Sequence, residues 1–180
     1  MFLSPEQREM LLGTSRPVLK TVMPILAYRG ETLINQLANM GLSFGAFAGL
    51  RTFEVQRALY AQGRETLATV NGYRSAANLP AFHVEAENNI VTYKKIGFHN
   101  YGLALDMVED GDARRACIQW SWQCTKDYLA IGPLAIKLGL EYGGFWKSFK
   151  DYPHIQLTGG ITIEECGRLY TQVAPLRGGL

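Results

Sequence analysis

The chain has 180 residues, of which 47% are hydrophobic and 19% are charged, and its formal net charge at pH 7 is +2. This composition is that of an ordinary globular protein and argues against a disordered one, while so small a charge excess does not by itself indicate nucleic-acid binding. The length fits one hydrophobic core, so we expect residues 1–180 to form a single domain.

The N-terminal region is predicted to be helical. Ser4 is a good helix cap and Pro5 suits the first helical position, so a helix is expected over residues 4–14. Residues 31–40 repeat large apolar side chains at helical spacing, and Gly41 is expected to end this second helix.

The middle of the chain is predicted to contain a strand, a helix and a long loop. Residues 43–50 are apolar and are expected to form a buried strand, after which Thr52 is a suitable N-cap for the next helix. Residues 63–98 are rich in glycine, asparagine and serine without a steady period, so we predict a long surface loop with a short helix near residues 75–78. Loops of this length in a compact domain are usually functional or mobile.

The C-terminal half is predicted to alternate strands and helices. A helix is expected over residues 124–138, closed by Gly139, and Thr162 with Glu165 has the spacing of a capping box for a last helix. Further strands are predicted at residues 102–108, 140–146 and 154–157, the first of them ended by a turn at 109–112. Loose alternation with short hairpin-like links favours an α+β fold, which we expect to be a small antiparallel sheet flanked by helices.

The cysteines and the N-terminus indicate the cell compartment in which the protein is made. Cys117, Cys124 and Cys166 include no pair with the two-residue spacing of a zinc ribbon or redox motif, and their odd number leaves at least one thiol free, so buried reduced thiols are expected. The first residues lack a basic segment followed by an apolar stretch, so no signal peptide is expected. No apolar run approaches the roughly 20 residues that cross a bilayer, and synthesis in a cytoplasm is the expectation.

The first cluster of chemically useful side chains runs from His99 to Asp106. Asp106 is a lone carboxylate in an apolar strand, and a buried charge is costly unless it is paired or bound to a metal. Ala104 lies on the same strand face and leaves room above the sheet. His83, by contrast, lies in the long loop and is interpreted as a surface or packing histidine.

The second cluster is Asp151-Tyr152-Pro153-His154. Pro153 fixes its own φ and favours an extended conformation at Tyr152, so Asp151 and His154 can face one pocket from either side of a rigid kink. Taken alone, these residues also fit a turn carboxylate and an ordinary strand histidine.

The two clusters together predict a metal site. Catalytic zinc takes three protein ligands, typically with nitrogen and oxygen donors, and keeps a fourth position open for water, and His99, Asp106 and His154 supply such a set. Hydrolysis also needs a separate base, for which Asp151 is the candidate. Arg51 directly follows the apolar strand and is either a surface arginine or a group that binds a substrate carboxylate or stabilises an oxyanion.

The pattern His99-x-x-Gly102-x-Ala104-x-Asp106, followed by Asp151-x-Pro153-His154, resembles the zinc D-Ala-D-Ala carboxypeptidases and the phage L-alanyl-D-glutamate endopeptidases, whose fold is shared with the hedgehog signalling domain. The resemblance extends from about residue 47 to residue 156. It implies that His99, Asp106 and His154 bind zinc, that Asp151 is the general base and that Arg51 handles substrate.

Within this family, the stretch Tyr60-Ala61-Gln62-Gly63-Arg64 is especially similar to phage endolysins and favours the endopeptidase branch. Two positions depart from the family pattern. Gly97 stands where a serine is common, which concerns the substrate subsites, and Phe145 stands where a polar residue often follows Gly-Gly. Trp146 is expected to belong to the core rather than to line the cleft.

The resemblance implies a zinc-dependent phage endolysin that cleaves the L-alanyl-D-glutamate bond of peptidoglycan stem peptides. It would act as a monomer without nucleic-acid or membrane partners. It would be made in the host cytoplasm and would reach the cell wall after release, with a holin. Within the single domain, we divide the chain into an N-terminal helical segment at about 1–40, a catalytic core at about 41–160 and a C-terminal helix at about 161–174.

Three other readings stay open. One is a D-Ala-D-Ala carboxypeptidase, and another is a phage structural protein that penetrates the wall. The third is a non-catalytic zinc-binding recognition module like the hedgehog domain, against which the presence of Asp151 argues.

Overall fold

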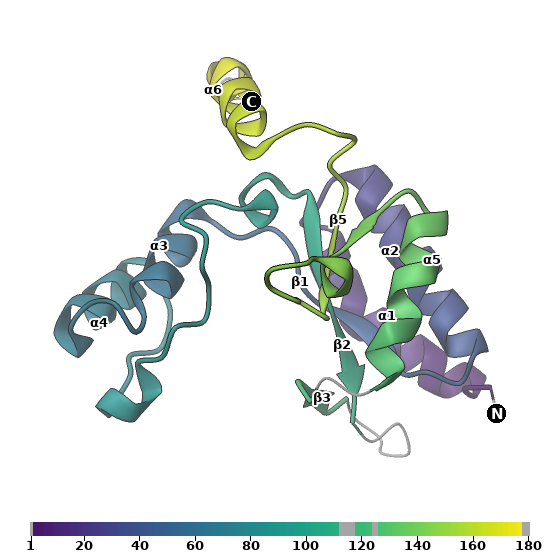
Figure 1. Cartoon of the computed structure of the whole chain (residues 1–180). Coiled ribbons are helices and arrows are strands. Elements are labelled where there is room, and N and C mark those ends of the chain that lie inside the picture. Colours follow the sequence, from purple (N-terminus) through teal and green to yellow (C-terminus); the bar gives the residue numbers. More distant parts are fainter. Residues whose placement is uncertain (1, 112–117, 124–125, 178–180) are drawn as a thin grey trace.

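The computed structural model describes residues 2–111, 118–123 and 126–177 (Figure 1). The strands are β1 Phe44–Ala48, β2 Ala104–Asp110, β3 Trp120–Ser121, β4 Glu141–Tyr142 and β5 His154–Gln156. The α-helices are α1 Pro5–Leu19, α2 Pro24–Asn39, α3 Phe53–Ala61, α4 Leu67–Ala76, α5 Ile131–Lys137 and α6 Ile163–Arg177. Short 3-10 turns are η1 Glu85–Glu87, η2 Phe98–Tyr101, η3 Lys126–Ala130 and η4 Gly143–Phe145.

The strands form one antiparallel sheet in the order β1-β2-β5-β4, with β3 paired to the C-terminal end of β2. Asp106 lies directly opposite His154, and Ala104 lies opposite Gln156. On the other side of β5, Gln156 pairs with Glu141 of β4. Directly opposed residues project from the same face of a sheet, so these side chains share one face. The small antiparallel sheet predicted from the sequence is confirmed.

The opposite face of the sheet carries the hydrophobic core. Leu105 and Met107 alternate with Ala104 and Asp106 along β2, and both are fully buried, as is Ile155 of β5. They pack with buried side chains of α1, α2 and α5, and Figure 1 shows these helices gathered beside the sheet. The core thus occupies one face, and Asp106 and its neighbours lie on the other.

The predicted helix caps are confirmed. The hydroxyls of Ser4 and Thr52 each accept a hydrogen bond from the backbone N–H of the third residue of the helix that follows. Thr162 and Glu165 exchange the reciprocal hydrogen bonds of a capping box at the start of α6. The glycines after α2 and α5 have positive φ angles, as expected where these helices end.

The predicted bounds of the first two helices are wrong at one end each. α1 continues to Leu19 instead of ending near residue 14, and α2 begins at Pro24 instead of residue 31. Ser15 shows why α1 continues: its buried hydroxyl donates to the carbonyl of Leu11 and accepts the N–H of Ala46 on β1. Packing against the strand extends the helix beyond what local propensity indicates.

The region predicted as a long loop, residues 63–98, contains helix α4. The short helix predicted near residues 75–78 is therefore wrong, because α4 begins after its Thr66 cap and runs to Ala76 against α3. Only Val70 of α4 is fully buried, so the sequence lacks the apolar stripe that would indicate a helix. Figure 1 shows α3 and α4 as a lobe to the left of the sheet.

The strand predictions find the right segments, but their ends are wrong. β1 and β5 are shorter than the predicted ranges, and β2 begins two residues late because Gly102 has a left-handed φ of 67°. The predicted strand over residues 140–146 is the two-residue β4 followed by the turn η4. β2 continues to Asp110, and the predicted turn at 109–112 ends outside the described residues.

The predicted helix over residues 124–138 is the turn η3 followed by α5, and its first two residues lie outside the described part of the chain. Cys117 and Cys124 also lie outside it, whereas Cys166 is a buried free thiol as expected. Among the described residues, no helix combines the length and apolar character needed to cross a lipid bilayer.

Candidate functional site

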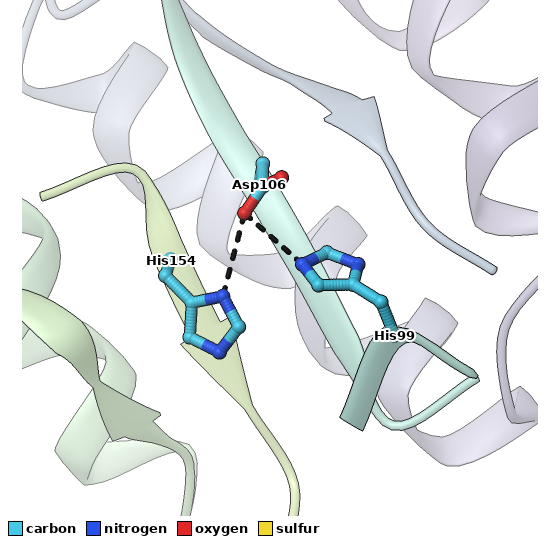
Figure 2. Close-up of side chains that lie close together, drawn as sticks. All are labelled: His99, Asp106 and His154. Carbon is cyan, nitrogen blue, oxygen red and sulfur yellow. Dashed lines mark hydrogen bonds and ion pairs between the residues drawn. The ribbon is translucent and has the colours of Figure 1, made fainter. Parts of the chain in front are cut away.

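Three side chains from distant parts of the sequence converge on the open face of the sheet (Figure 2). His99 Nε2 lies 3.2 Å from Asp106 Oδ1, and His154 Nδ1 lies 3.4 Å from the same oxygen. The centroids of the two imidazole rings are 5.1 Å apart. The three residues predicted as metal ligands are therefore brought together.

His99 is positioned by the connection between β1 and α3. Its Nδ1 lies 2.7 Å from the carbonyl oxygen of Gly49, which can only accept, so Nδ1 carries the proton and donates it. The backbone N–H of Arg51 donates to the His99 carbonyl at 3.0 Å. The remaining nitrogen of His99, Nε2, therefore presents its lone pair toward Asp106.

His154 is positioned by the register of β5. The carbonyl of Pro153, just before it, accepts the N–H of Met107 at 2.8 Å, so β2 fixes the kink as well as the strand. His154 Nε2 lies 3.0 Å from Oε1 of Gln156. The amide oxygen accepts the Nε2 proton, which leaves the Nδ1 lone pair directed at Asp106.

A row of polar side chains behind His154 was missed in the sequence. Gln156 Nε2 donates to Glu141 Oε2 at 2.7 Å, and the Thr158 hydroxyl donates to Glu141 Oε1. The carboxylate of Glu141 thus fixes which way the Gln156 amide points, and the amide oxygen in turn orients the imidazole of His154. The period-two spacing of His154 and Gln156 on one strand is the signal that could have revealed it.

The donor set fits a tetrahedral metal ion. With metal–ligand distances of about 2.0–2.1 Å, neighbouring ligands of tetrahedral zinc lie about 3.3–3.4 Å apart. The two separations from Asp106 Oδ1 are 3.2 Å and 3.4 Å, and the three candidate ligand atoms all lie within 4.8 Å of one another. Three protein ligands leave a position open, as catalytic sites require. Mixed nitrogen and oxygen ligands also suit other divalent ions.

Without a metal, the cluster holds protons. Burial by itself raises the pKa of the Asp106 carboxyl, but the charges and hydrogen bonds of His99 and His154 outweigh it and hold that pKa well below its usual range. Burial by itself lowers the pKa of His154, but the hydrogen bond and charge of Asp106, with the charge of Asp151, raise it above its ordinary value. A metal ion must therefore compete with a proton for His154.

Asp151, the predicted base, lies beside the three candidate ligands. Its N–H donates to the Gly143 carbonyl at 3.1 Å, and its own carbonyl accepts the N–H of His154 at 3.2 Å. Burial raises the pKa of the Asp151 carboxyl, the charge of Asp106 adds to this, and the nearby cations offset part of it. Only glycine fits at position 143, because a Cβ there would lie 2.5 Å from the carbonyl oxygen of Asp151.

Arg51 is half-buried in the site and is not an ordinary surface arginine. Its Nη2 lies 3.7 Å from Asp106 Oδ2, and its Nη1 donates to Gln56 Oε1 at 3.0 Å. Gln56 is buried and donates to the Lys94 carbonyl at 2.6 Å. Gln56, which the sequence analysis missed, therefore ties Arg51 to the α3–α4 lobe.

The structure also bears on what the sequence suggested for Trp146, His83 and Phe145. Trp146 is half-buried and its ring centroid lies 5.1 Å from that of His154, so it lines the site, and the expected core role is wrong. His83 is exposed and its backbone N–H is bonded to Glu87, in keeping with its interpretation as a surface residue. Phe145, in the place where a polar residue is common, packs edge-on against Tyr142 at 5.1 Å.

Comparison with known proteins gives consistent matches. The family model described as D-alanyl-D-alanine carboxypeptidase matches residues 92–157, which include His99, Asp106, Asp151 and His154. The chain is 33% identical over 152 residues to the peptidoglycan L-alanyl-D-glutamate endopeptidase CwlK of Bacillus subtilis (strain 168), covering 78% of this chain and 76% of that protein.

The chain is also similar to solved structures. The L-Ala D-Glu endopeptidase ChiX of Serratia marcescens has a TM-score of 0.51 at 23% identity, covering 80% of this chain and 86% of that one. The vancomycin resistance D,D-pentapeptidase VanY, solved in complex with Zn(II), has a TM-score of 0.46 at 16% identity, covering 83% of this chain and 77% of that one. The likeness to ChiX bears on the fold.

Replacing Gln156 by leucine is expected to weaken metal binding about 10- to 100-fold, because the His154 ring loses the acceptor that orients it. A competition titration against a chromophoric chelator measures the change. Gln172→Leu, on the exposed face of α6, is the matched control and should bind metal like the wild type. Unchanged affinity in the Gln156 variant would mean that the polar row does not support the ligand.

Metal affinity is expected to rise with pH. The pKa of His154 is raised in the folded metal-free protein, so below that pKa the metal displaces a proton and its affinity falls about tenfold per pH unit. By linkage, His154 also contributes to the free energy of unfolding of the metal-free protein. This contribution is full below the pKa of His154 in the unfolded chain, about 6.5, and is lost as the pH rises through its raised pKa in the folded protein. Calorimetric titrations in two buffers count the protons released. No release near neutral pH would contradict the arrangement.

Proposed function

Because this chain belongs to the family of peptidoglycan peptidases described as D-alanyl-D-alanine carboxypeptidase, we propose that it is a zinc-dependent endopeptidase of the peptidoglycan stem peptide. The proposed cut is the L-alanyl-D-glutamate bond, supported by the 33% identity to an endopeptidase of that specificity. The observation that carries the proposal is the convergence of His99, Asp106 and His154 beside the separate carboxylate of Asp151.

The metal we propose is zinc, held by His99 Nε2, His154 Nδ1 and the Asp106 carboxylate. The ligand separations support it, as does the fixed proton on the far nitrogen of each imidazole. When bound, zinc supplies a Lewis acid that polarises a carbonyl and lowers the pKa of water from about 15.7 to about 7.

Asp151 is the proposed general base. Its carboxylate accepts a proton as water attacks the peptide carbonyl and then delivers that proton to the leaving amine nitrogen. The raised pKa of Asp151 suits this role, because a carboxylate that holds its proton more tightly is a stronger base. Two hydrogen bonds of the Asp151 backbone keep its carboxylate beside the proposed ligands without making it one of them.

Arg51 is the proposed electrostatic partner of the substrate. Its guanidinium is kept in the site by Gln56 and lies near the outer oxygen of Asp106. A guanidinium so placed can pair with a substrate carboxylate or stabilise the negative charge that develops on the carbonyl oxygen.

A second candidate function is that of a D-Ala-D-Ala carboxypeptidase. The family model that matches residues 92–157 is described as D-alanyl-D-alanine carboxypeptidase, and this description favours the second candidate. The same ligands and base would serve, and the two activities differ only in which peptide bond the cleft accepts. A non-catalytic zinc module is disfavoured, because such a module has no need of a base beside its metal.

We further propose a lytic role in a phage-infected host, supported by the similarity of Tyr60-Ala61-Gln62-Gly63-Arg64 to phage endolysins. The enzyme would then be made in the host cytoplasm and reach the wall through a holin. Expression in a bacterial host with and without a holin tests this. Lysis only in the presence of the holin supports the role, and equal lysis in its absence contradicts it.

Replacing Asp151 by asparagine is expected to lower turnover by about 10²- to 10⁴-fold, because the base is lost while the metal ligands remain. Purified walls are digested with the zinc-loaded protein, and the new termini are identified by mass spectrometry. New N-terminal D-glutamate identifies the endopeptidase, and released D-alanine identifies the carboxypeptidase. Glu164→Gln, which removes an exposed carboxylate of α6, is the control. Full activity of the Asp151 variant would remove that residue from the mechanism.

A further inference from the structure

A second concave site lies on the α3–α4 lobe. Its volume is about 290 Å³, and its lining is both basic and aromatic. We call it the α3–α4 pocket and define it by Arg57, Tyr60, Arg64, Tyr73 and Lys95. None of these residues takes part in the proposed hydrolysis, so the gathering of three cations here calls for a separate role.

The cations of the pocket lie against the faces of its tyrosines. The guanidinium carbon of Arg57 lies 4.2 Å from the Tyr73 ring centroid, and that of Arg64 lies 4.2 Å from the Tyr60 centroid. Lys95 Nζ lies 5.6 Å from the Tyr60 centroid. A guanidinium held against a ring keeps the N–H groups along its edge in a fixed plane, which suits forked bonding to an oxyanion.

The pocket is built before any ligand arrives. Arg57 and Tyr60 lie three residues apart on one side of α3, and Arg64 follows the end of that helix at Ala61. Arg57 donates to the Tyr73 hydroxyl at 3.1 Å, and Arg64 donates to backbone carbonyls of residues 60 and 92 at 2.6 Å and 3.0 Å. Both guanidiniums are therefore already immobilised, and a ligand would not have to order them.

The pocket carries an excess of positive charge, with three cations against the one carboxylate of Glu65. Among the described residues, Arg57, Arg64 and Lys95 make no ion pair with a carboxylate. Glu65 also lines the pocket but forms no such pair with them. Tyrosine faces attract cations without cancelling their charge, so an anion bound here would gain from three nearby cations.

Gln56 and the backbone of Lys94 connect the pocket with Arg51. Arg51 donates to Gln56, and Gln56 donates to the carbonyl of Lys94, the residue before Lys95. The basic side of the pocket is thus two hydrogen bonds away from an arginine that lies beside Asp106.

A second link follows the aromatic side chains. The Arg64 guanidinium carbon lies 5.9 Å from the Tyr93 ring centroid, and the Tyr93 ring meets that of Phe149 at 5.2 Å, edge to face. Phe149 is two residues before Asp151. A substrate strand that lies across Asp151 therefore has a path along exposed aromatic surface to the α3–α4 pocket.

We propose that the α3–α4 pocket binds a carboxylate of the peptidoglycan stem peptide at a position remote from the bond that is cut. This inference rests on the proposed function for the identity of its ligand. Stem peptides carry free carboxylates, and three unpaired cations with pre-ordered arginines are suited to take one. The pocket would contribute to substrate affinity and leave the chemical step unchanged.

The test measures binding of soluble stem peptides to zinc-loaded protein carrying Asp151→Asn, so that no turnover is needed. Lys95→Gln is the variant, because Lys95 is exposed and makes no hydrogen bond within the described residues that folding would lose. Its Kd is expected to rise about 3- to 10-fold, between the effects of an exposed ion pair and of a charge-assisted hydrogen bond. Lys137→Gln, an exposed cation of α5, is the charge-matched control and should leave Kd unchanged.

A second arm uses peptides whose carboxylates beyond the cleavage site are converted to amides. The amidated peptides should bind equally to the protein that keeps Lys95 and to the Lys95→Gln variant, because the peptide no longer carries the charge that Lys95 would meet. An equal Kd for both proteins on the free-carboxylate peptide overturns the proposal. The proposal is also overturned if Lys95→Gln weakens binding only to walls that carry phosphate polymers, and if this difference disappears when the polymers are removed. That result would assign the pocket to phosphate. In the active protein, KM should rise with kcat unchanged. Absence of any peptide cleavage would refute the proposed function while leaving the binding result readable.

Discussion

The pairing of β2 with β5 is the constraint on which the site depends. It sets Asp106 directly opposite His154, and it sets Gln156 between Ala104 and Glu141 in the next row. A shift of the register by one residue would turn His154 toward the core and remove it from the ligand set. The small side chain of Ala104 leaves space beside Gln156, so the residue that orients the histidine fits on the same face.

The electrostatics of the site follow from the same geometry. One carboxylate, Asp106, lies against two imidazoles and an arginine, and it stays charged although it is largely buried. A second carboxylate, Asp151, lies just outside that group and has its pKa raised by burial. The two neighbouring carboxyl groups thus differ in their pKa, which suits the different tasks proposed for them: Asp106 as a metal ligand and Asp151 as a base.

The sequence was most informative where residue type or a local rule is enough to indicate the structure. His99, Asp106 and His154 could be predicted as partners because their residue types match one coordination chemistry, and the helix caps follow from local rules. The spacing of His154 and Gln156 indicates that they share a face, but the contact of Gln156 with Glu141 depends on which strand lies beside β5, and no local pattern states that. Helix α4 was missed because it buries little, and α1 was cut short because the contact of Ser15 with β1 is tertiary.

We propose that the side chains of His99, Asp106 and His154 share one metal ion, and the metal content of the purified protein can decide this. Elemental analysis of the wild type should find one zinc ion per chain, retained in His83→Ala and lost when His99, Asp106 or His154 is replaced by alanine. Full zinc content in any of these last three variants, or loss of zinc in His83→Ala, would rule out a metal site formed by these three residues.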